Sequence, residues 1–177
     1  FGTINLLEVV KKLKSLQGII IITSDKCYAP KNYYLKEKDE LFGIDPYSSS
    51  KSCQEIITWS YKKCFLQNIP LATARSGNVI GGGDYSKDRL ITDLYNSIKN
   101  DTDIILRNPS NIRPWIFVLD TLRGYLDLMI ALNKNLIKYS EPWNFSLNKG
   151  DQISVNELVN IIVRKYKINN KIIRMNK

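Results

Sequence analysis

Residues 18–28 read Gly-Ile-Ile-Ile-Ile-Thr-Ser-Asp-Lys-Cys-Tyr, and this stretch is the strongest indication of the fold class of the chain. Four consecutive β-branched residues are typical of a strand that is covered on both faces within a parallel sheet. Before it, apolar residues recur at helical spacing over residues 2–15, and Gly18 ends that pattern. After it, a polar and turn-rich segment extends over residues 29–45. The stretch therefore predicts a helix followed by a buried parallel strand.

Helical and strand patterns alternate along the rest of the chain. A helix is expected to begin at Asp45-Pro46, because proline is tolerated in a first helical turn. Its predicted apolar face consists of Cys53, Ile56, Ile57, Ser60, Tyr61 and Cys64. The remaining predicted elements are strands over 71–75, 104–106 and 143–147 and helices over 88–100, 120–132 and 154–166. Such alternation predicts an α/β fold with a parallel sheet.

Two of these helices carry further local signals. Ser154 and Glu157 are spaced as a capping box, in which side chains and backbone amides at a helix start bond reciprocally. In the helix over 120–132, Leu122, Leu126 and Met129 are expected to form the apolar stripe.

The composition excludes several classes of site and partner. The 177 residues contain no histidine, so neither a Ser–His–Asp triad nor a histidine-ligated zinc site can form within them, and no metal site is predicted. No apolar run approaches the roughly 20 residues of a membrane-spanning helix, so no membrane partner is expected. The net charge of +9 comes from scattered lysines without a basic run interleaved with aromatic residues, and we predict no nucleic-acid partner.

The cysteines and the first residues bear on the compartment and on completeness. Cys27, Cys53 and Cys64 are an odd set without CxxC spacing, which predicts free thiols and a cytoplasmic protein. The chain begins Phe1-Gly2-Thr3, without an initiator methionine and without the basic segment of a secretory signal. We therefore expect this chain to be the C-terminal part of a longer protein.

Tyr47 and Lys51 lie four residues apart at the start of a predicted helix, so both project from one side of it. Many helices carry such a pair without any function. The chemistry of the pair is nevertheless specific, because a neighbouring ammonium favours the phenolate and makes tyrosine a usable base near neutral pH. A site without histidine needs a base of this kind.

Two polar stretches follow predicted strands. The residues from Thr23 to Tyr28 come directly after the isoleucine strand, and ligands of parallel sheets bind beyond the carboxyl ends of the strands. Residues 74–84 read Ala-Arg-Ser-Gly-Asn-Val-Ile-Gly-Gly-Gly-Asp, and small residues after a strand let a ligand approach the backbone. Each stretch taken alone is equally compatible with an ordinary turn.

Taken together, these stretches resemble the extended branch of the short-chain dehydrogenase/reductase superfamily. Tyr47-Ser48-Ser49-Ser50-Lys51 is similar to its YxxxK motif, and Arg75-Ser76-Gly77-Asn78 is similar to its Arg-x-x-Asn motif. Residues 23–28 resemble the active-site strand end of its sugar-nucleotide dehydratases, and residues 1–8 and 111–120 resemble other segments in the family's order. The resemblance covers nearly the whole chain.

Within this branch, the sequence resembles the CDP-glucose 4,6-dehydratase group. Lys26 stands where other sugar-nucleotide dehydratases carry glutamate, which argues against a dTDP-glucose or GDP-mannose enzyme. Residues 77–84 and 107–115 are also similar to this group. An epimerase or another sugar-nucleotide dehydratase of the branch stays an alternative, and so does a truncated, non-catalytic remnant.

The resemblance implies a fold and a reaction. The fold would be α/β, the C-terminal part of a Rossmann-type doubly wound parallel sheet with a smaller C-terminal substrate-binding lobe. Residues 1–80 and 115–147 would belong to the NAD-binding domain, and residues 81–114 and 148–177 to the substrate-binding lobe. The reaction would be the NAD-dependent intramolecular redox dehydration of CDP-glucose to CDP-4-dehydro-6-deoxyglucose, by a lyase that forms a homodimer or a higher homo-oligomer.

The resemblance also implies roles for individual residues. Tyr47, tuned by Lys51, would take the proton of the sugar 4-hydroxyl, and Ser24 would hydrogen-bond the 4-oxygen. Asp25 would be the acid for the leaving hydroxyl, and Lys26 would occupy the position of the C5 base. NAD would contact Tyr47, Lys51, Ser76 and Gly77, and the nucleotide diphosphate would contact Asn78, Arg89 and Arg113.

The family's glycine-rich phosphate loop and its ribose-binding acidic residue do not occur in this sequence. We therefore expect the 177 residues by themselves to bind NAD negligibly and to be inactive as a dehydratase. Isothermal titration calorimetry of the isolated chain with NAD measures this directly. A micromolar affinity would contradict the interpretation of the chain as the C-terminal part of a longer enzyme.

Overall fold

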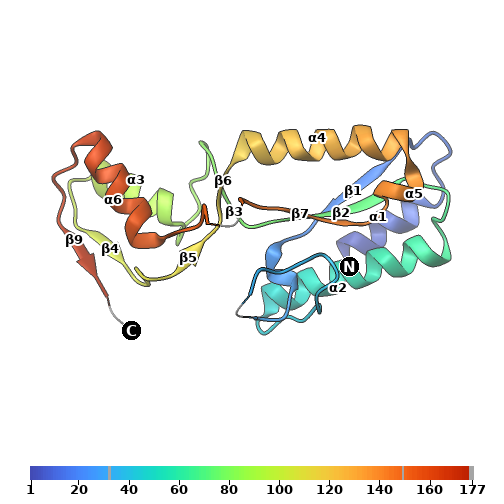
Figure 1. The fold of residues 1–177 in the computed structure, drawn as a ribbon, viewed down its shortest axis with the longest axis horizontal. Helices are drawn as coiled ribbons and strands as arrows, with labels where there is room; N and C mark the ends of the chain where they lie inside the picture. Colours follow the sequence, from blue (N-terminus) through green and yellow to red (C-terminus); the bar gives the residue numbers. More distant parts are fainter. Residues whose placement is uncertain (32, 149, 176–177) are drawn as a thin grey trace. The chain divides into compact units, whose positions relative to one another are not determined.

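The computed structural model describes residues 1–31, 33–148 and 150–175. The chain forms two compact units, whose helices and strands are labelled in Figure 1. The first, called the sheet unit, consists of Phe1–Gly77 and Leu119–Ser146, and the second unit consists of Asn78–Val118 and Leu147–Lys177. The expected roles of the two parts in NAD and substrate binding stay predictions.

A parallel sheet runs through the sheet unit. Its strands are β1 (Ile19–Ile22), β2 (Leu71–Ser76) and β7 (Pro142–Phe145), in the order β1-β2-β7. Ile19 pairs with Leu71, and both neighbouring pairs of strands are parallel. Their carboxyl ends therefore lie at one edge of the sheet, where parallel sheets bind ligands. The predicted α/β class with parallel strands is confirmed.

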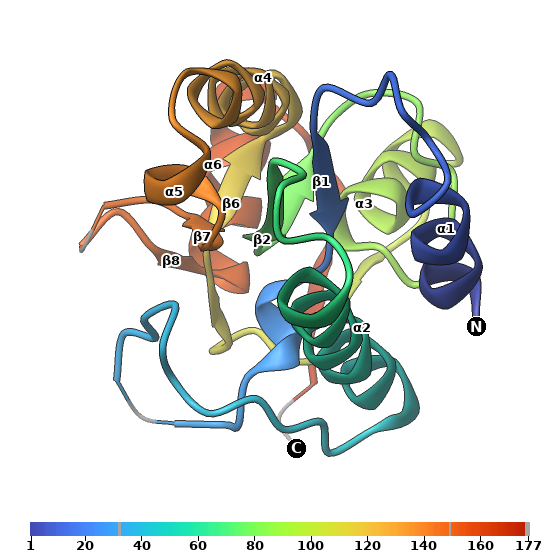
Figure 2. The ribbon, with the colours of Figure 1, turned by 90° about the vertical axis from the view of Figure 1, so that its right-hand side faces the viewer.

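Helices cover both faces of this sheet, as Figure 2 shows. Helices α1 (Gly2–Val10) and α2 (Pro46–Cys64) lie on one face, and α4 (Val118–Lys134), followed by the short α5 (Leu136–Tyr139), lies on the other. Two buried hydrophobic clusters fill the layers, one of Leu7, Val10, Leu66 and Leu71 and one of Ala72, Leu128 and Leu132. Alternate side chains of the strands thus enter opposite cores, as the two-residue period of a strand requires.

The isoleucine strand β1 forms an edge of the described sheet, where it pairs with β2 alone. Ile21 is buried, and Ile19 and Ile20 are half-buried. Ile22 is 44% exposed, because the described residues leave its side chain open to solvent. The predicted coverage on both faces is therefore wrong for Ile22.

Helix α2 buries a different face from the one that its apolar residues predict. The side chains that it buries are those of Ser48, Ser52, Glu55 and Thr58. Of the predicted face, Ile57 and Tyr61 pack partly against the core, and the exposed residues are Cys53, Ile56, Ser60 and Cys64. The prediction of this face is wrong because Glu55 is drawn inward by a buried ion pair with Arg75.

Helix α4 also presents another side to the sheet than predicted. Thr121, Leu128 and Leu132 are buried. Leu122 and Leu126 are 48% and 67% exposed, so the predicted stripe is wrong for these two leucines. The buried side follows a spacing of seven and four residues, which is also helical, and hydropathy alone does not choose between two such stripes.

The second unit is built from short strand pairs and two helices. Parallel pairs join β3 (Asn78–Ile80) to β6 (Trp115–Phe117) and β4 (Ile104–Leu106) to β9 (Ile172–Arg174), and an antiparallel pair joins β5 (Ile112–Arg113) to β8 (Ile153–Ser154). Helices α3 (Leu90–Lys99) and α6 (Val155–Tyr166) contribute to its core, which contains Leu94, Ile104, Leu106 and Val159.

Local signals explain where several helices begin. Ser154 caps α6 as predicted, since its Oγ accepts from the Glu157 amide and the Glu157 carboxylate accepts from the Ser154 amide. Helix α3 begins later than predicted because Asp88 has a φ of 63°, in the left-handed region outside the α-helix. Helix α1 ends at Val10, before the predicted end at residue 15.

Within the described ranges, we find no helix with the length and apolarity of a membrane span.

Candidate functional site

The carboxyl end of β1 leads into a short 3-10 helix, η1 (Asp25–Cys27), which Ser24 caps. The Ser24 Oγ accepts a hydrogen bond from the Lys26 amide at 3.2 Å and donates one to Asp25 Oδ1 at 3.1 Å. Ser24 is buried, Asp25 is half-buried and Lys26 is exposed. The predicted residues of this strand end, called the catalytic turn below (Ser24, Asp25 and Lys26), form one compact unit.

Tyr47 and Lys51 lie in the first turns of α2, as predicted. Asp45 fixes the helix start, since its Oδ1 accepts from the amides of Tyr47 at 2.9 Å and Ser48 at 3.0 Å. The Lys51 Nζ lies 5.8 Å from the centre of the Tyr47 ring and donates to Gln54 Oε1 at 3.3 Å. Tyr47 is 55% exposed, so its phenol is open to a ligand.

Helix α2 packs against η1, and the structure thereby brings the two groups of catalytic candidates together. The Ser52 Oγ donates to the Cys27 carbonyl at 2.8 Å, and the Phe42 amide donates to the same carbonyl at 3.0 Å. The pKa of Asp45 lies below its ordinary value, first because of hydrogen bonds from Ser48, then from the Tyr47 amide and the Lys26 ammonium. The charge of Lys26 thus acts at the start of the helix that carries Tyr47.

The predicted cofactor residues are Ser76, the last residue of β2, and Gly77, which follows it at the same end of the sheet. The Thr23 amide donates to the Ala74 carbonyl at 2.9 Å, which extends the pairing of β1 with β2 up to the catalytic turn. The Ser76 Oγ shares a hydrogen bond of 2.9 Å with the Tyr125 hydroxyl of α4. Tyr125 packs edge-on against Phe145 of β7, at 5.0 Å between ring centres.

The predicted diphosphate residues Asn78, Arg89 and Arg113 all belong to the second unit. Asn78 begins β3, and its amide donates to the Pro114 carbonyl at 3.1 Å. Arg89 is exposed and precedes α3, and Arg113 is half-buried in β5, where it pairs with Ile153.

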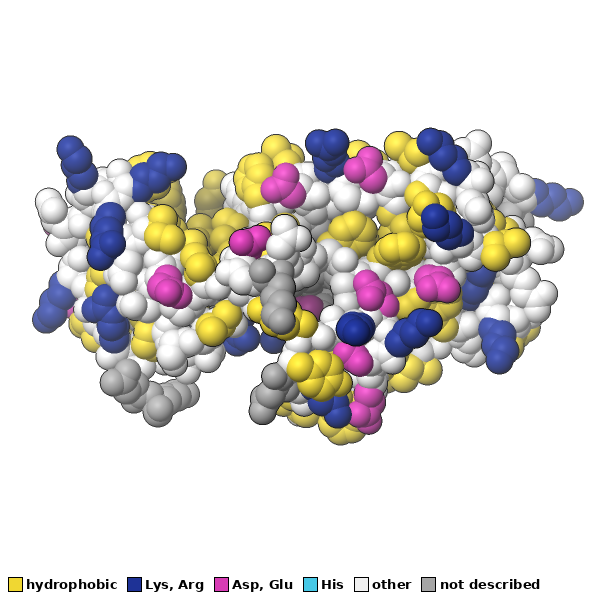
Figure 3. All heavy atoms as spheres, viewed as in Figure 1, with side chains coloured by type: hydrophobic (Ala, Val, Ile, Leu, Met, Phe, Trp, Pro, Cys, Tyr) yellow, Lys and Arg dark blue, Asp and Glu magenta, His cyan; other side chains and the backbone are white. Residues whose placement is uncertain are grey.

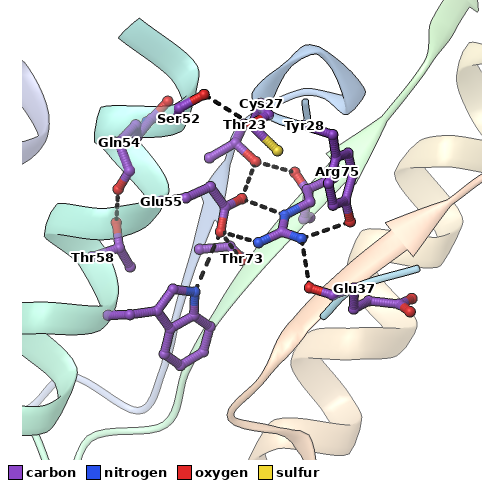
Figure 4. Close-up of polar contacts among 12 residues, drawn as sticks. Thr23, Cys27, Tyr28, Glu37, Ser52, Gln54, Glu55, Thr58, Thr73 and Arg75 are labelled. Atoms are coloured by element: carbon purple, nitrogen blue, oxygen red, sulfur yellow. Dashed lines mark hydrogen bonds and ion pairs between the residues drawn. The ribbon is translucent and has the colours of Figure 1, made fainter. Parts of the chain in front are cut away.

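A buried ion pair lies between α2 and β2, at the centre of Figure 4. The Glu55 side chain is fully buried and that of Arg75 is 2% exposed. Arg75 Nη2 donates to Glu55 Oε2 at 2.7 Å, and Arg75 Nε donates to Oε1 at 2.8 Å. This is the bidentate arrangement in which a guanidinium and a carboxylate interact most strongly.

Further donors complete the surroundings of the Glu55 carboxylate. Thr23 donates to Oε1, Thr73 donates to Oε2 at 2.8 Å, and Trp59 Nε1 donates to Oε2 at 3.3 Å. Burial opposes the ionisation of Glu55, but the hydrogen bonds from Arg75 and Thr23 outweigh it and hold the pKa of this carboxyl below its ordinary value. Glu55 is therefore charged, and Arg75 compensates its charge.

The sequence reasoning misses Glu55 and gives Arg75 no role beyond its motif. A signal was available, since Glu55 continues the four-residue spacing of Tyr47 and Lys51 along α2. Glutamate in a helix is usually solvated, however, and its partner lies 20 residues further along the chain.

The three cysteines of the chain differ in their exposure. Cys27 is buried, Cys53 and Cys64 are exposed, and all three are free, as the odd set predicts. Burial raises the pKa of the Cys27 thiol to about 12, so this thiol is inert at neutral pH.

Figure 3 shows lysine and arginine side chains interspersed with acidic and apolar ones on the face of the sheet unit that it draws. Among the described residues, no group of histidine, cysteine, aspartate or glutamate side chains could hold a metal ion.

The site's geometry can be set beside known proteins. A family model described as GDP-mannose 4,6 dehydratase matches residues 1–176. The chain belongs to the GDP-mannose 4,6 dehydratase family. It is 40% identical over 171 residues to the CDP-glucose 4,6-dehydratase of Salmonella typhimurium, a match that covers 92% of this chain and 48% of that protein.

Solved structures similar to this family member share its fold. The UDP-glucuronic acid 4-epimerase of Bacillus cereus, in complex with UDP-glucuronic acid and NAD, has a TM-score of 0.85 at 22% identity, over 99% of this chain and 53% of that one. The dTDP-glucose 4,6-dehydratase of Bacillus anthracis, in complex with NAD, has a TM-score of 0.79 at 22% identity, over 99% of this chain and 55% of that one. The chain thus spans about half the length of these relatives.

The family match and the 40% identity confirm the resemblance to sugar-nucleotide 4,6-dehydratases. The solved structures also confirm that the sheet unit is part of a Rossmann-type fold. The roles of the individual site residues stay predictions.

Proposed function

We propose that this chain carries the catalytic segments of an NAD-dependent CDP-glucose 4,6-dehydratase, which converts CDP-glucose to CDP-4-dehydro-6-deoxyglucose. The observation that carries the proposal is the packing of the helix of Tyr47 and Lys51 against the catalytic turn at the strand end. The 40% identity to the Salmonella CDP-glucose enzyme supports the substrate. Lys26 supports it further, because this position carries glutamate in the dehydratases of other sugar nucleotides that the sequence resembles.

The residues at the sheet edge fit NAD. Parallel strands β1 and β2 end side by side, a small residue, Gly77, follows β2, and Tyr47 and Lys51 offer a phenol and an ammonium nearby. We propose that Tyr47, Lys51, Ser76 and Gly77 contact this cofactor. When bound, NAD would supply the redox chemistry, as acceptor and later donor of one hydride equivalent.

Tyr47 is proposed to carry out the first proton transfer. We propose that its phenolate takes the proton of the 4-hydroxyl as C4 becomes a ketone, with the Lys51 ammonium favouring the phenolate. Ser24, which keeps the hydrogen bond that it accepts from the Lys26 amide, turns its hydroxyl proton from Asp25 Oδ1 to the 4-oxygen.

Asp25 and Lys26, the two residues after Ser24, are proposed to catalyse the loss of water. The 4-keto group acidifies the C5 proton, and the amine of Lys26 removes it once this side chain has given its own ammonium proton to solvent. Asp25 in its protonated form gives a proton to the 6-hydroxyl, which leaves as water as the C5–C6 double bond forms. The protein thus ends this step with one proton gained at position 26 and one lost at position 25, and the sugar has lost one water. As C6 then becomes a methyl group, Lys26 gives its proton back to C5, and the proton that Tyr47 took from the 4-hydroxyl balances the one that Asp25 lost.

Binding of the nucleotide is assigned to the second unit. We propose that Asn78, Arg89 and Arg113 hold the diphosphate, because the forked donors of arginine suit phosphate oxygens. The free cysteines support a cytoplasmic setting. We also propose that the enzyme forms a homodimer or a higher homo-oligomer.

The test uses the complete gene product, supplied with NAD and in parallel with CDP-glucose, dTDP-glucose, GDP-mannose and UDP-glucuronic acid. We expect mass spectrometry to show the loss of one water from CDP-glucose and much slower loss from the other nucleotide sugars. Rapid dehydration of dTDP-glucose or GDP-mannose instead would refute the assigned substrate. A product of unchanged mass with altered stereochemistry would identify an epimerase.

Replacing Lys26 with alanine is expected to lower the rate of water loss by at least ~100-fold, because no other group then removes the C5 proton. In heavy water, C4 should still be oxidised in a single turnover, and solvent deuterium should not enter C5. Nuclear magnetic resonance of the bound sugar measures both. Lys134→Ala, which changes an exposed lysine at the end of α4, is the matched control and should behave as the wild type.

The contrary results for Lys26→Ala are distinct. Wild-type turnover would remove Lys26 from the mechanism. Weaker CDP-glucose binding with normal deuterium entry at C5 would leave Lys26 an electrostatic role only. Partial activity of Lys26→Glu would support a base position shared with the related dehydratases.

A further inference from the structure

Tyr28 directly follows η1 and is buried, with 5% of its surface exposed. Its hydroxyl accepts a hydrogen bond from Arg75 Nη1 at 2.6 Å and donates one to Asn144 Oδ1 at 2.7 Å. Burial raises the pKa of Tyr28, so the phenol keeps its proton and both bonds at neutral pH. Tyr28 therefore joins the segment after the catalytic turn to β2 and to β7.

Arg75 extends this junction to the helix of Tyr47 and Lys51. Its Nη1 holds Tyr28, while its Nε and Nη2 hold Glu55 of α2 (Figure 4). Thr23, immediately before Ser24, donates to the same Glu55 carboxylate. The catalytic turn is thus held on both sides, by Thr23 on Glu55 and by Tyr28 on Arg75.

Asn144 extends the junction to the segment that leads from η1 to α2. The backbone amide of Asn144 donates to Glu37 Oε1 at 3.0 Å, and its side-chain Nδ2 donates to the Leu35 carbonyl at 3.3 Å. Arg75 Nη1 also donates to the Glu37 carbonyl at 3.0 Å. The hydroxyl of Tyr28 therefore lies at the centre of a network that reaches α2, β2, β7 and the segment between η1 and α2.

We infer that Tyr28 is a positioning residue, which sets the catalytic turn against the helix of Tyr47 and Lys51 through Arg75 and Asn144. The inference rests on the proposed function, since it gives Tyr28 a part in that reaction. The Tyr28 hydroxyl is buried, and both of its hydrogen bonds are made with protein groups. Tyr28 therefore acts through Arg75 and Asn144 and not on the substrate. Positioning matters because a misplacement of about 1 Å costs up to ~100-fold in rate.

The test variant is Tyr28→Phe in the complete gene product, which keeps the buried ring and removes both hydroxyl bonds. We expect kcat to fall between about 10-fold and 100-fold, because the turn loses its orientation. The KM for CDP-glucose should change by no more than roughly threefold, since the residues proposed to bind the diphosphate are untouched. Hydrogen exchange should accelerate at the amides of residues 24–28 and 35–42.

Tyr61→Phe is the matched control. The Tyr61 hydroxyl donates to Glu8 Oε1 at 2.6 Å, between α2 and α1, and this variant loses a comparable bond without touching the network. It should keep the wild-type kcat and the wild-type exchange at residues 24–28.

The outcomes separate this inference from the proposed function. Exchange at residues 24–28 that is unchanged in Tyr28→Phe, or a kcat equal to that of Tyr61→Phe, would overturn the inference. A wild-type protein that does not dehydrate CDP-glucose would contradict the proposed function alone. In that case the exchange comparison still decides whether Tyr28 holds the turn.

Discussion

Replacing Glu55 with alanine is expected to lower the free energy of unfolding by about 3–5 kcal/mol. The loss arises because Arg75, whose side chain is 2% exposed, would keep its charge without the carboxylate that compensates it. The hydroxyl of Thr73 would lose its acceptor as well, and that of Thr23 would keep only the more distant Ala74 carbonyl, at 3.4 Å. Urea unfolding followed by circular dichroism at neutral pH measures the change in the 177-residue chain.

An exposed ion pair provides the control for this prediction. Arg123 Nε lies 3.7 Å from Asp127 Oδ2, and the two side chains are 84% and 66% exposed. Asp127→Ala should therefore change the unfolding free energy by less than about 1 kcal/mol. In the double variant Glu55→Ala/Arg75→Ala, the loss should be smaller than the sum of the single losses, because neither charge is left alone. A Glu55→Ala loss no larger than the Asp127→Ala loss would show that the buried pair does not stabilise the sheet unit.

The same carboxylate should make stability depend on pH in the acid range. Burial opposes its ionisation, but hydrogen bonds from Arg75 and Thr23 bring its folded-state pKa below the ordinary value of 4.5. Since the pKa is depressed on folding, this stabilisation is fully present above about pH 4.5 and is lost as the pH falls through the folded-state pKa. Glu55→Gln should flatten this part of the decline, as measured by urea unfolding at a series of acid pH values. An equally steep decline in both proteins would assign it to other carboxylates.

Tyr47→Phe in the complete gene product should lower kcat for CDP-glucose by about 10²- to 10⁴-fold, the range expected when a general base is removed. The ring and its contact with the Lys51 ammonium remain, so binding of the nucleotide sugar should stay within roughly threefold of the wild type. Stopped assays of product formation and calorimetric titration with CDP-glucose measure the two effects separately.

Tyr95→Phe is the matched control for that variant. Tyr95 and Tyr47 are both 55% exposed, and both lie in helices, but Tyr95 belongs to α3 of the second unit. Its replacement should leave kcat unchanged. Near-normal kcat in Tyr47→Phe would show that the YxxxK assignment is wrong.

Local patterns were sufficient for the elements that carry the site. The isoleucine run predicts β1, and Asp45-Pro46 predicts the start of α2, because the strand preference of β-branched residues and helix capping are local properties of the sequence. Tyr47 and Lys51 therefore fall on one helix as expected, and the catalytic turn falls at a strand end. These signals are short in range, and the structure leaves them intact.

Long-range pairing was not predictable in the same way. Glu55 is polar, yet it is fully buried, because a guanidinium 20 residues away compensates its charge. Tyr28 and Asn144 meet across 116 residues. Hydropathy assigns polar residues to solvent, so it placed the apolar face of α2 where Ile56 is exposed, and it could not show which polar residues become partners.

The path of a single deuterium atom distinguishes the proposed dehydration from other reactions of nucleotide sugars. The complete gene product would be incubated with NAD and CDP-glucose labelled with deuterium at C4, and the product examined by nuclear magnetic resonance. We predict that the label appears at C6, in a methyl group beside a C4 ketone, because the hydrogen removed from C4 is returned within the same sugar. A label that returns to C4 in a product that still contains its 6-hydroxyl would contradict a dehydratase.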